Sequence, residues 1–290
     1  MRTSFQIRRH APRIVIGSIA GALAIGLGLF ALTRAEGSDP VDLQMHRAVY
    51  DLSVDRVKAA SEVEGLDGRM VVEWRGGPAC EGYTSEQRVV TRSSDEANAI
   101  SVSDVRLTSF ESLDGHEFRF DRVEYADGKP SLRQSGHVYR KGGRVVLEEE
   151  GKEPAELPGD VLFPTAFNVA LLQAARDGKT VFSNTLFDGT QSTATYVTAF
   201  IGKRATAPAD ARKVRIRNRG AGAALDNASP WHVHVSYFDQ DDRGNDETPS
   251  FEMGFAMFPN GVMSALTLDY DDMVLKGDLT QIEYFKPGAC

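Results

Sequence analysis

The sequence predicts a mainly β protein in which a curved, barrel-like antiparallel sheet wraps around one central α-helix. Two observations predict this fold class. Turn-forming dipeptides recur along the chain, and the stretches between them alternate apolar and polar residues with a period of two, which is typical of strands with one buried face. A single segment has the periodicity of a helix instead. A sheet of about a dozen strands can bury one apolar helix by curving around it.

The predicted turns and strands follow one another through the chain. The dipeptides that tolerate a positive φ in tight turns are Asp67-Gly68, Asp114-Gly115, Asp127-Gly128, Gly142-Gly143, Asp188-Gly189 and Asn260-Gly261. The apolar strand faces are Met70, Val72 and Trp74, then Phe118 and Phe120, then Trp231, Val233, Val235 and Tyr237, and last Leu266, Leu268 and Tyr270. Polar neighbours are expected to face solvent, among them Glu73, Arg119, His232 and Ser264.

A helix is predicted over residues 166–176. Thr165 is the expected N-cap, and Gly178 is the expected stop signal. Apolar residues cover most of the circumference of this helix: Phe167, Val169, Ala170, Leu171, Leu172 and Ala174. Because such a helix must be buried, it is the element around which the sheet is expected to curve.

The first 35 residues are expected to be an export segment, and residues 36–290 a single β domain. Arg2, Arg8, Arg9 and Arg13 precede residues 14–32, which carry no charge. Together with a small-residue cleavage site before Glu36, this pattern is typical of a secretory signal peptide. The charge-free run is also nearly long enough to span a bilayer, so an uncleaved signal anchor is the alternative. Either topology places the remaining chain outside the cytoplasm.

The amino-acid composition and the net charge exclude some classes of binding partner. The chain of 290 residues is 41% hydrophobic, which excludes wholesale disorder. Residues 1–35 hold five arginines and no acidic residue, so the remainder has 28 basic against 41 acidic residues. A net charge near −13 repels nucleic acid and anionic lipid headgroups. Nucleic acid is therefore not expected as a partner, and membrane contact is expected only if the N-terminal segment is uncleaved.

Two cysteines, Cys80 and Cys290, are the only ones in the chain. In an exported protein, two cysteines most simply form one disulfide bond, and two unrelated thiols are the alternative. The bond would close a loop of roughly 210 residues, for which chain entropy gives at most about 5 kcal/mol of stabilisation.

No catalytic or metal site is assigned. His232 and His234 project from one face of an expected strand, as in half of a zinc site, but the spacing supplies no third ligand. No nucleophile elbow, zinc-protease motif, phosphate-binding loop or dinucleotide fingerprint is present in the sequence. We therefore expect neither a metal nor a cofactor, and no enzymatic activity.

The order of short motifs along the body resembles the EipB-like family of periplasmic cell-envelope integrity proteins of alphaproteobacteria, formerly a family of unknown function. The motifs span about 240 residues and are specific only as an ordered set. They are Tyr50-Asp51-Leu52-Ser53, Gly68-Arg69-Met70, Cys80-Glu81-Gly82-Tyr83-Thr84, Phe110-Glu111, Asp114-Gly115, Phe118-Arg119-Phe120, Leu157-Pro158, Leu162-Phe163-Pro164-Thr165, Phe187-Asp188-Gly189, Pro249-Ser250-Phe251-Glu252, Asn260-Gly261-Val262, Leu268-Asp269-Tyr270-Asp271-Asp272 and Cys290. One departure is Phe167, where the family is expected to have a histidine.

The resemblance implies a β-spiral around a central helix, with a disulfide between Cys80 and Cys290. It also implies a periplasmic protein of a Gram-negative bacterium that supports envelope integrity and stress resistance, has no known enzymatic activity, and has a periplasmic tetratricopeptide-repeat partner.

The leading functional hypothesis is an exported, non-enzymatic periplasmic protein that maintains the envelope through protein–protein contacts. Acidic residues Asp239, Asp241, Asp242 and Asp246 are expected at a hairpin tip, where they would steer a basic partner towards a strand edge. The alternative is a periplasmic carrier that binds acyl chains of lipid or lipoprotein in a concave apolar cavity. A cavity lined by apolar side chains beside the helix favours the carrier, whereas a filled core favours the scaffold.

Overall fold

The computed structural model of the chain describes residues 41, 43–58, 63–218, 225–238, 248–270, 272–286 and 288–290. The expected export segment and the acidic residues Asp239, Asp241, Asp242 and Asp246 lie outside these residues, so both remain predictions. Within the described part of the chain, no helix is long and apolar enough to cross a membrane.

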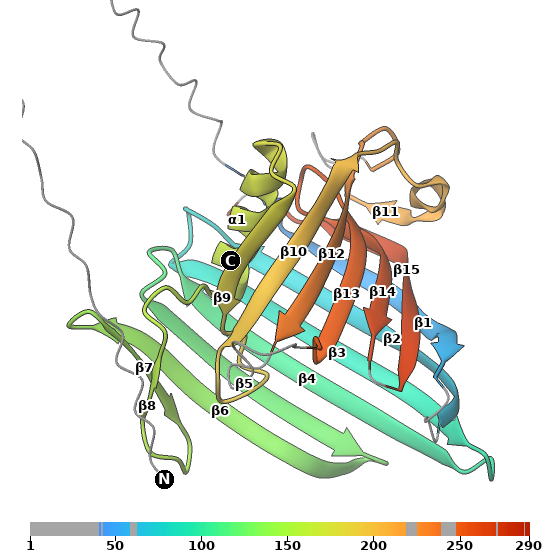
Figure 1. The fold of residues 1–290 in the computed structure, drawn as a ribbon, viewed down its shortest axis with the longest axis horizontal. Coiled ribbons are helices and arrows are strands. Elements are labelled where there is room, and N and C mark those ends of the chain that lie inside the picture. The colour runs from blue at the N-terminus through green and yellow to red at the C-terminus, as the bar shows by residue number, and fades with distance from the viewer. Residues whose placement is uncertain are drawn as a thin grey trace, which may run out of the picture. The chain divides into compact units, whose positions relative to one another are not determined.

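The described chain is built from strands and one α-helix (Figure 1). The strands before the helix are β1 (His46–Val57), β2 (Val63–Gly76), β3 (Gly82–Asp95), β4 (Ile100–Ser112), β5 (Glu117–Ala126), β6 (Lys129–Lys141), β7 (Arg144–Glu149) and β8 (Ala155–Leu157). The helix α1 (Pro164–Arg176) is followed by β9 (Val181–Leu186), β10 (Thr195–Arg204), the 3₁₀ turn η1 (Ala209–Lys213), β11 (Arg215–Arg217), β12 (Trp231–Phe238), β13 (Phe251–Met257), β14 (Met263–Asp269) and β15 (Met273–Tyr284).

The strands form one curved sheet in the order β8-β7-β6-β5-β4-β3-β2-β1-β15-β14-β13-β12-β10-β9. From β1 in the middle of the sheet, the chain runs outward to the β8 edge, crosses through α1 to the β9 edge, and returns inward to β15 beside β1 (Figure 1). All neighbours in this order are antiparallel, and among the described strands β11 alone pairs in parallel, with β15. The predicted fold class, a curved antiparallel sheet around one helix, is therefore confirmed.

The sheet does not close into a continuous barrel. Its two edges are β8 and β9, and within the described chain one isolated bridge, from Leu162 to Leu186, joins the segment before α1 to the β9 edge. The Leu162 N–H donates to the Thr185 carbonyl at 2.8 Å, and the Phe187 N–H donates to the Leu162 carbonyl at 3.0 Å. The segment that leads into α1 thus covers one end of the β9 edge.

The helix begins earlier than predicted and ends as predicted. Pro164 occupies the first helical turn and Phe163 is the N-cap residue without a side-chain cap, so the predicted Thr165 cap is wrong. At the other end, Gly178 has a φ of +73° and its N–H donates to the Ala175 carbonyl, while the next N–H donates to the Ala174 carbonyl. These two bonds form a Schellman motif, which requires the left-handed conformation that glycine adopts readily.

Two details of the strand prediction are corrected. Asp67-Gly68 lies inside β2 instead of in a turn. A Cβ atom on Gly68 would lie 2.5 Å from the Val90 carbonyl oxygen of β3, so this glycine permits a close approach of two strands. Ser264 is buried, because it lies two residues before Leu266 and therefore on the same face of β14.

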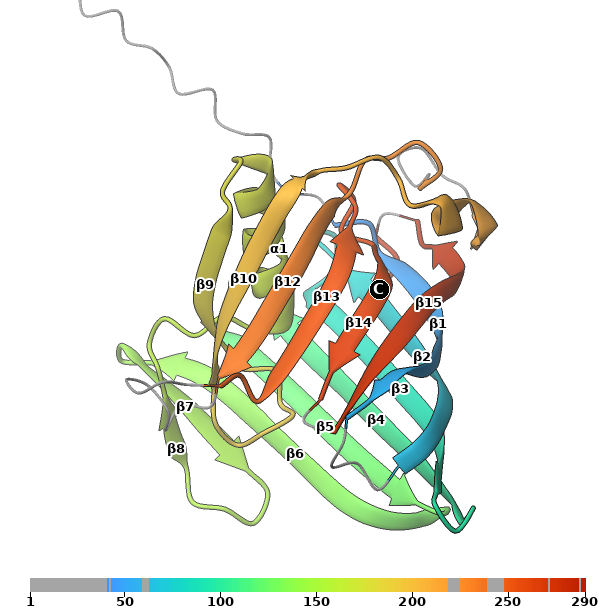
Figure 2. The ribbon, with the colours of Figure 1, turned by 45° about the vertical axis from the view of Figure 1, so that its right-hand side comes forward.

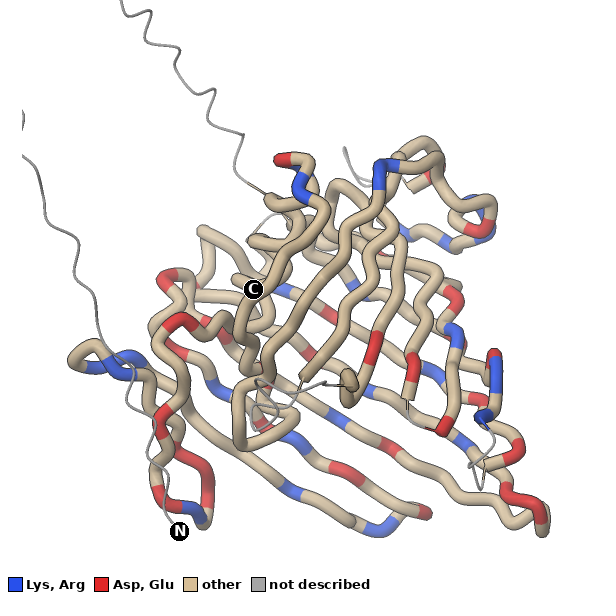
Figure 3. Tube along the Cα trace, in the orientation of Figure 1, with Lys and Arg blue, Asp and Glu red and all other residues tan. Residues whose placement is uncertain are grey.

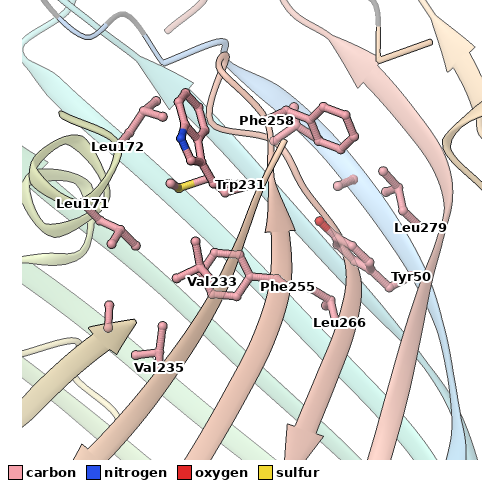
Figure 4. Packing of buried hydrophobic residues seen from close by; sticks show 14 of the residues in the cluster. Tyr50, Leu171, Leu172, Trp231, Val233, Val235, Phe255, Phe258, Leu266 and Leu279 are labelled. Carbon is pink, nitrogen blue, oxygen red and sulfur yellow. The ribbon is translucent and has the colours of Figure 1, made fainter. Parts of the chain in front are cut away.

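The core lies on the concave face of the sheet, where α1 packs next to β9 and β10 (Figure 2). Leu171 and Leu172 of α1 point towards the side chains of Trp231, Val233 and Val235 on β12 (Figure 4). A second cluster lies beneath β5, β6 and β7, where the rings of Phe118, Phe120, Phe163 and Phe187 pack against one another. The helix and the residues just before it thus pack against strands that precede α1 in the sequence and against strands that follow it.

Candidate ligand cavity

The helix does not fill the concave face of the sheet. A cavity of about 490 Å³ remains between α1 and the strands on both sides of it. Phe167 and Leu171 of α1 form one wall, and side chains of β1 to β4 and of β12 to β15 form the others. The cavity answers the question left open by the sequence: the space beside the helix is not filled by the core.

The lining of the cavity is predominantly apolar. Its apolar side chains are Leu52, Met70, Val72, Trp74, Val89, Leu107, Pro164, Phe167, Leu171, Leu186, Val235, Phe251, Met253, Phe255, Met263, Leu266, Leu268 and Leu275. Its polar side chains are His46, Tyr50, Ser85, Gln87, Thr91, Ser109, Asn168, Asp188, Thr190, Tyr237 and Tyr270. Among these lining residues there is no lysine or arginine, and Asp188 is the sole carboxylate.

Three aromatic residues mark the exposed end of the cavity. The ring centroid of Phe251 lies 5.3 Å from that of Tyr237 and 4.9 Å from that of Tyr270. Tyr270 is 41% exposed and is the one lining residue in the described chain with so large an exposed fraction. Asp188 lies close enough to Tyr237 to add to the effect of burial, and both raise the pKa of the Tyr237 hydroxyl. The rim therefore combines aromatic faces with hydroxyl groups and one carboxylate.

Glu111, near the end of β4, anchors the N-terminus of α1. Its Oε2 accepts the Thr165 N–H at 2.7 Å and its Oε1 accepts the Ala166 N–H at 2.9 Å. These are two of the N–H groups that have no partner within a helix. The side chain is buried, and burial raises the pKa of its carboxyl group although the two backbone bonds oppose the rise. A carboxylate from β4 thus replaces the missing N-cap and fixes one wall of the cavity.

The opposite end of the cavity holds the buried imidazole of His46. Its Nδ1 lies 2.6 Å from the Gln44 carbonyl oxygen, so this nitrogen carries the proton. Burial lowers the pKa of His46, which favours the neutral ring. Nearby, the Tyr50 hydroxyl donates to the Met263 carbonyl at 2.9 Å. Both polar groups are satisfied within the protein, so this end of the cavity presents no charge.

The loop between β9 and β10 holds Asp188 and Thr190 at the cavity. Its base is tied to Glu149 of β7, whose Oε1 accepts the Ser192 hydroxyl at 3.2 Å. The Arg122 guanidinium of β5 donates to the Thr190 carbonyl and pairs with Glu124. Because these contacts join the loop to β5 and β7, they connect the two ends of the spiral sheet.

The disulfide between Cys80 and Cys290 is present in the structure, with the two Cα atoms 5.8 Å apart. It joins the last residue of the chain to the turn between β2 and β3, and the Gly76 N–H donates to the Ala289 carbonyl beside it. A second hollow, of about 570 Å³, lies next to this bond. It is lined by only eight residues, most of them small, and lacks the enclosing apolar walls of the cavity beside α1.

The two histidines singled out in the sequence lie on the outer face of β12, and both are exposed. The His234 Nε2 lies 3.0 Å from the Glu252 Oε1, and no group of three histidine, cysteine, aspartate or glutamate side chains within the described ranges is placed to hold a metal ion. Sequence reasoning gave no role to Glu111, His46 or Asp188. Glu111 and Asp188 do belong to motifs that carry the family resemblance, and this membership was the one signal in the sequence that could have identified them.

The comparisons with known proteins agree with this architecture. A family model described as EipB-like matches residues 38–286. The Cell envelope integrity protein EipB of Brucella abortus (strain 2308) is 33% identical over 258 residues, which cover 88% of this chain and 89% of the relative. A crystal structure of a β-barrel-like protein of the domain of unknown function DUF1849 from Brucella abortus is 32% identical, with a TM-score of 0.78 over 85% of this chain and 100% of that one. The chain therefore belongs to the EipB-like family.

Proposed function

We propose that this protein is an exported, non-enzymatic protein of the periplasm that maintains the cell envelope by binding acyl chains of lipid or lipoprotein. The relative named as a cell envelope integrity protein supports the envelope role. The observation that carries the acyl-chain proposal is the apolar cavity of about 490 Å³ beside α1. A protein that acted only as a rigid scaffold would gain stability by filling this space, because protein interiors are normally close-packed.

The energetics favour an aliphatic ligand. Each CH₂ group transferred from water to an apolar site contributes about 0.8 kcal/mol. Burial of about ten CH₂ groups would contribute roughly 8 kcal/mol, which exceeds the lower estimates of the cost of immobilising a ligand. The cavity lining supplies the required surface, since aliphatic and aromatic side chains outnumber polar ones.

A second function is favoured by a different part of the sheet. Strand β8 is a sheet edge of three residues, and Ala155 and Glu156 on it are exposed. Such an edge can pair with a strand from another protein. Along most described strands basic and acidic residues are interspersed, but the end of β7 and the turn to β8 are mostly acidic, with Glu148, Glu149, Glu150 and Glu153 against Lys152 (Figure 3). Steering of a basic partner to this edge would rest on these glutamates together with the predicted acidic tip of Asp239, Asp241, Asp242 and Asp246. The family resemblance implies a tetratricopeptide-repeat protein as the partner.

The test of acyl-chain binding uses a fluorescent fatty-acyl probe and purified residues 36–290. We expect saturable binding with one probe per chain. Thr91→Trp places a large side chain in the cavity and should weaken binding at least tenfold, whereas Arg92→Trp, on the opposite face of β3, should leave it within about twofold. Equal binding by both variants, or no saturable binding, would reject the carrier. Recovery of a protein partner without lipid from envelope extract would support the edge-pairing function instead.

A further inference from the structure

We propose that the cavity takes one acyl chain per protein molecule, of at most about 20 carbons, attached through an uncharged ester or amide instead of ending in a free carboxylate. This inference rests on the proposed function and adds to it the number, length and chemistry of the chains. It follows from three properties of the cavity: its volume, the charges in its lining, and the residues at its exposed end.

The volume sets the number of chains. An apolar protein cavity of about 150 Å³ accommodates benzene, which corresponds to about 25 Å³ per carbon atom. At this density the cavity of about 490 Å³ holds about 20 carbons. One chain of 16 to 18 carbons fits, whereas the two chains of a diacyl lipid need nearly twice the volume. A second chain would have to remain in water or on another protein.

The charges in the lining select against a free carboxylate. No lysine or arginine is among the lining residues of the described chain, and the one carboxylate there is Asp188. The contacts identify two cations beside the lining. Arg122 donates to the Thr190 carbonyl and pairs with Glu124, and Lys58 donates to the Tyr270 carbonyl and pairs with Asp269. A fatty-acid carboxylate at this end would lose water, meet Asp188 and find no unpaired cation. An ester or amide carbonyl carries no such penalty.

The exposed end of the cavity suits an uncharged polar group. Tyr237, Phe251 and Tyr270 form a row of contacting rings there, and Tyr270 is the most exposed of them. Tyrosine rings present an apolar body to a chain and a hydroxyl group to its polar end. At the opposite end, the His46 imidazole and the Tyr50 hydroxyl bond to backbone carbonyls and present no charge, while Phe167 and Leu171 of α1 form an apolar wall along the cavity. The methyl end of the acyl chain therefore lies towards Tyr50 and the linkage lies at the aromatic row.

The experiment is competition against the fluorescent acyl probe at about pH 8, where a fatty-acid carboxyl group is ionised. Monoacylglycerols of increasing length should bind more tightly up to about 18 to 20 carbons and then more weakly. Monopalmitoylglycerol should bind at least tenfold more tightly than palmitate. Asp188→Asn, which keeps an oxygen acceptor for Thr190, should narrow this difference by strengthening palmitate binding alone.

A second variant pair tests the volume argument. Val89→Phe adds four heavy atoms to the lining, about 100 Å³ at the density above, and should shorten the preferred chain by about four carbons. Val90→Phe makes the same change on the opposite face of β3 and should leave the preferred length unchanged.

The outcomes separate this inference from the proposed function. Three outcomes would each overturn the inference while leaving acyl-chain binding in place. They are binding of diacylglycerol with both acyl chains shielded from water, equal affinity for palmitate and monopalmitoylglycerol, and an unchanged length preference in Val89→Phe. If no acyl ligand of any length bound saturably, the proposed function and the inference would both be overturned.

Discussion

Replacing Glu111 by alanine should loosen α1 and destabilise the fold. The carboxylate accepts the Thr165 N–H at 2.7 Å and the Ala166 N–H at 2.9 Å, and its side chain is 5% exposed. The substitution therefore leaves two backbone donors at a buried helix end without partners. No nearby side chain of α1 replaces them, since the N-cap residue Phe163 makes no side-chain cap bond.

The size of the effect is set by two opposing contributions. Hydrogen bonds to a charged group are worth about 1.5–3 kcal/mol each, so two such bonds give roughly 3–6 kcal/mol. Removing a buried carboxylate relieves its desolvation, which the raised pKa of Glu111 reports. We expect a net loss of about 2–4 kcal/mol in the free energy of unfolding, which lowers the melting temperature by roughly 5–15 °C in a domain of this size.

The raised pKa of Glu111 also fixes how the loss depends on pH. A carboxyl group whose pKa is higher in the folded than in the unfolded state binds more protons when folded. The part of the stability that comes from this difference in proton binding is present in full below the ordinary pKa of about 4.5 and is lost as the pH rises through the folded-state value, whereas the two backbone hydrogen bonds contribute at both pH values. The gap between the wild type and Glu111→Ala should therefore be wider at about pH 4 than at about pH 7.

The measurement is urea unfolding at both pH values, monitored by circular dichroism, with Glu86→Ala as the control. Glu86 is an exposed glutamate of β3, and its replacement should change stability by no more than about 0.5 kcal/mol at either pH. A Glu111→Ala protein as stable as the Glu86→Ala protein would refute the capping role. A gap that widens towards pH 7 would refute the assignment of the pKa shift.

Two further substitutions test the disulfide bond and the close packing of a glycine against the Phe120 ring. Cys80→Ser should reduce the free energy of unfolding by at most about 5 kcal/mol, and lower the melting temperature accordingly, because the bond to Cys290 closes a long loop. Folding should persist because the domain has its own core. Thiol labelling of both cysteines in the folded wild type would contradict this bond. Gly189→Ala should cost more than Gly178→Ala in thermal unfolding, because both residues have φ near +75° but only the Cβ at 189 would lie 2.6 Å from the Phe120 ring. Equal costs would show that the ring moves freely.

The strands and the helix could be predicted because each buries one face. Trp231, Val233 and Val235 alternate with polar residues because one face of β12 is buried. This alternation is visible in the local sequence without knowledge of the rest of the fold. The prediction failed where an interaction came from a distant strand. Gly68 resembles a turn residue in the sequence, and it takes the neighbouring β3 to show that it permits close strand packing.

The cavity and its anchor could not be predicted for the same reason. Glu111 caps a helix that begins more than 50 residues later, so no spacing rule connects the two. The cavity depends on the curvature of the whole sheet and on the position of α1, and neither is encoded in one segment. Apolar lining residues such as Val89 and Leu107 have the alternation of ordinary core residues.

The lengths of the elements explain why space remains on the concave face. The helix has 13 residues and is about 20 Å long, whereas β2 and β3 have 14 residues each and extend over about 46 Å. Glu111 holds the start of α1 near one end of β4, and a helix of this length is less than half as long as these strands. Val89 and Leu107 are consequently only half-buried although they face inward.

A ligand that covers this surface should therefore stabilise the fold as well as occupy the cavity. A ligand that binds only the folded state at about 100 times its Kd adds about 2.7 kcal/mol to the free energy of unfolding. In a domain of this size we expect the melting temperature to rise by roughly 5–10 °C with monopalmitoylglycerol. Thr91→Trp should show little of this rise, because the indole occupies part of the space. An equal rise in Thr91→Trp and in Arg92→Trp would place the stabilising contact outside the cavity and refute the coupling between the half-buried strands and the ligand.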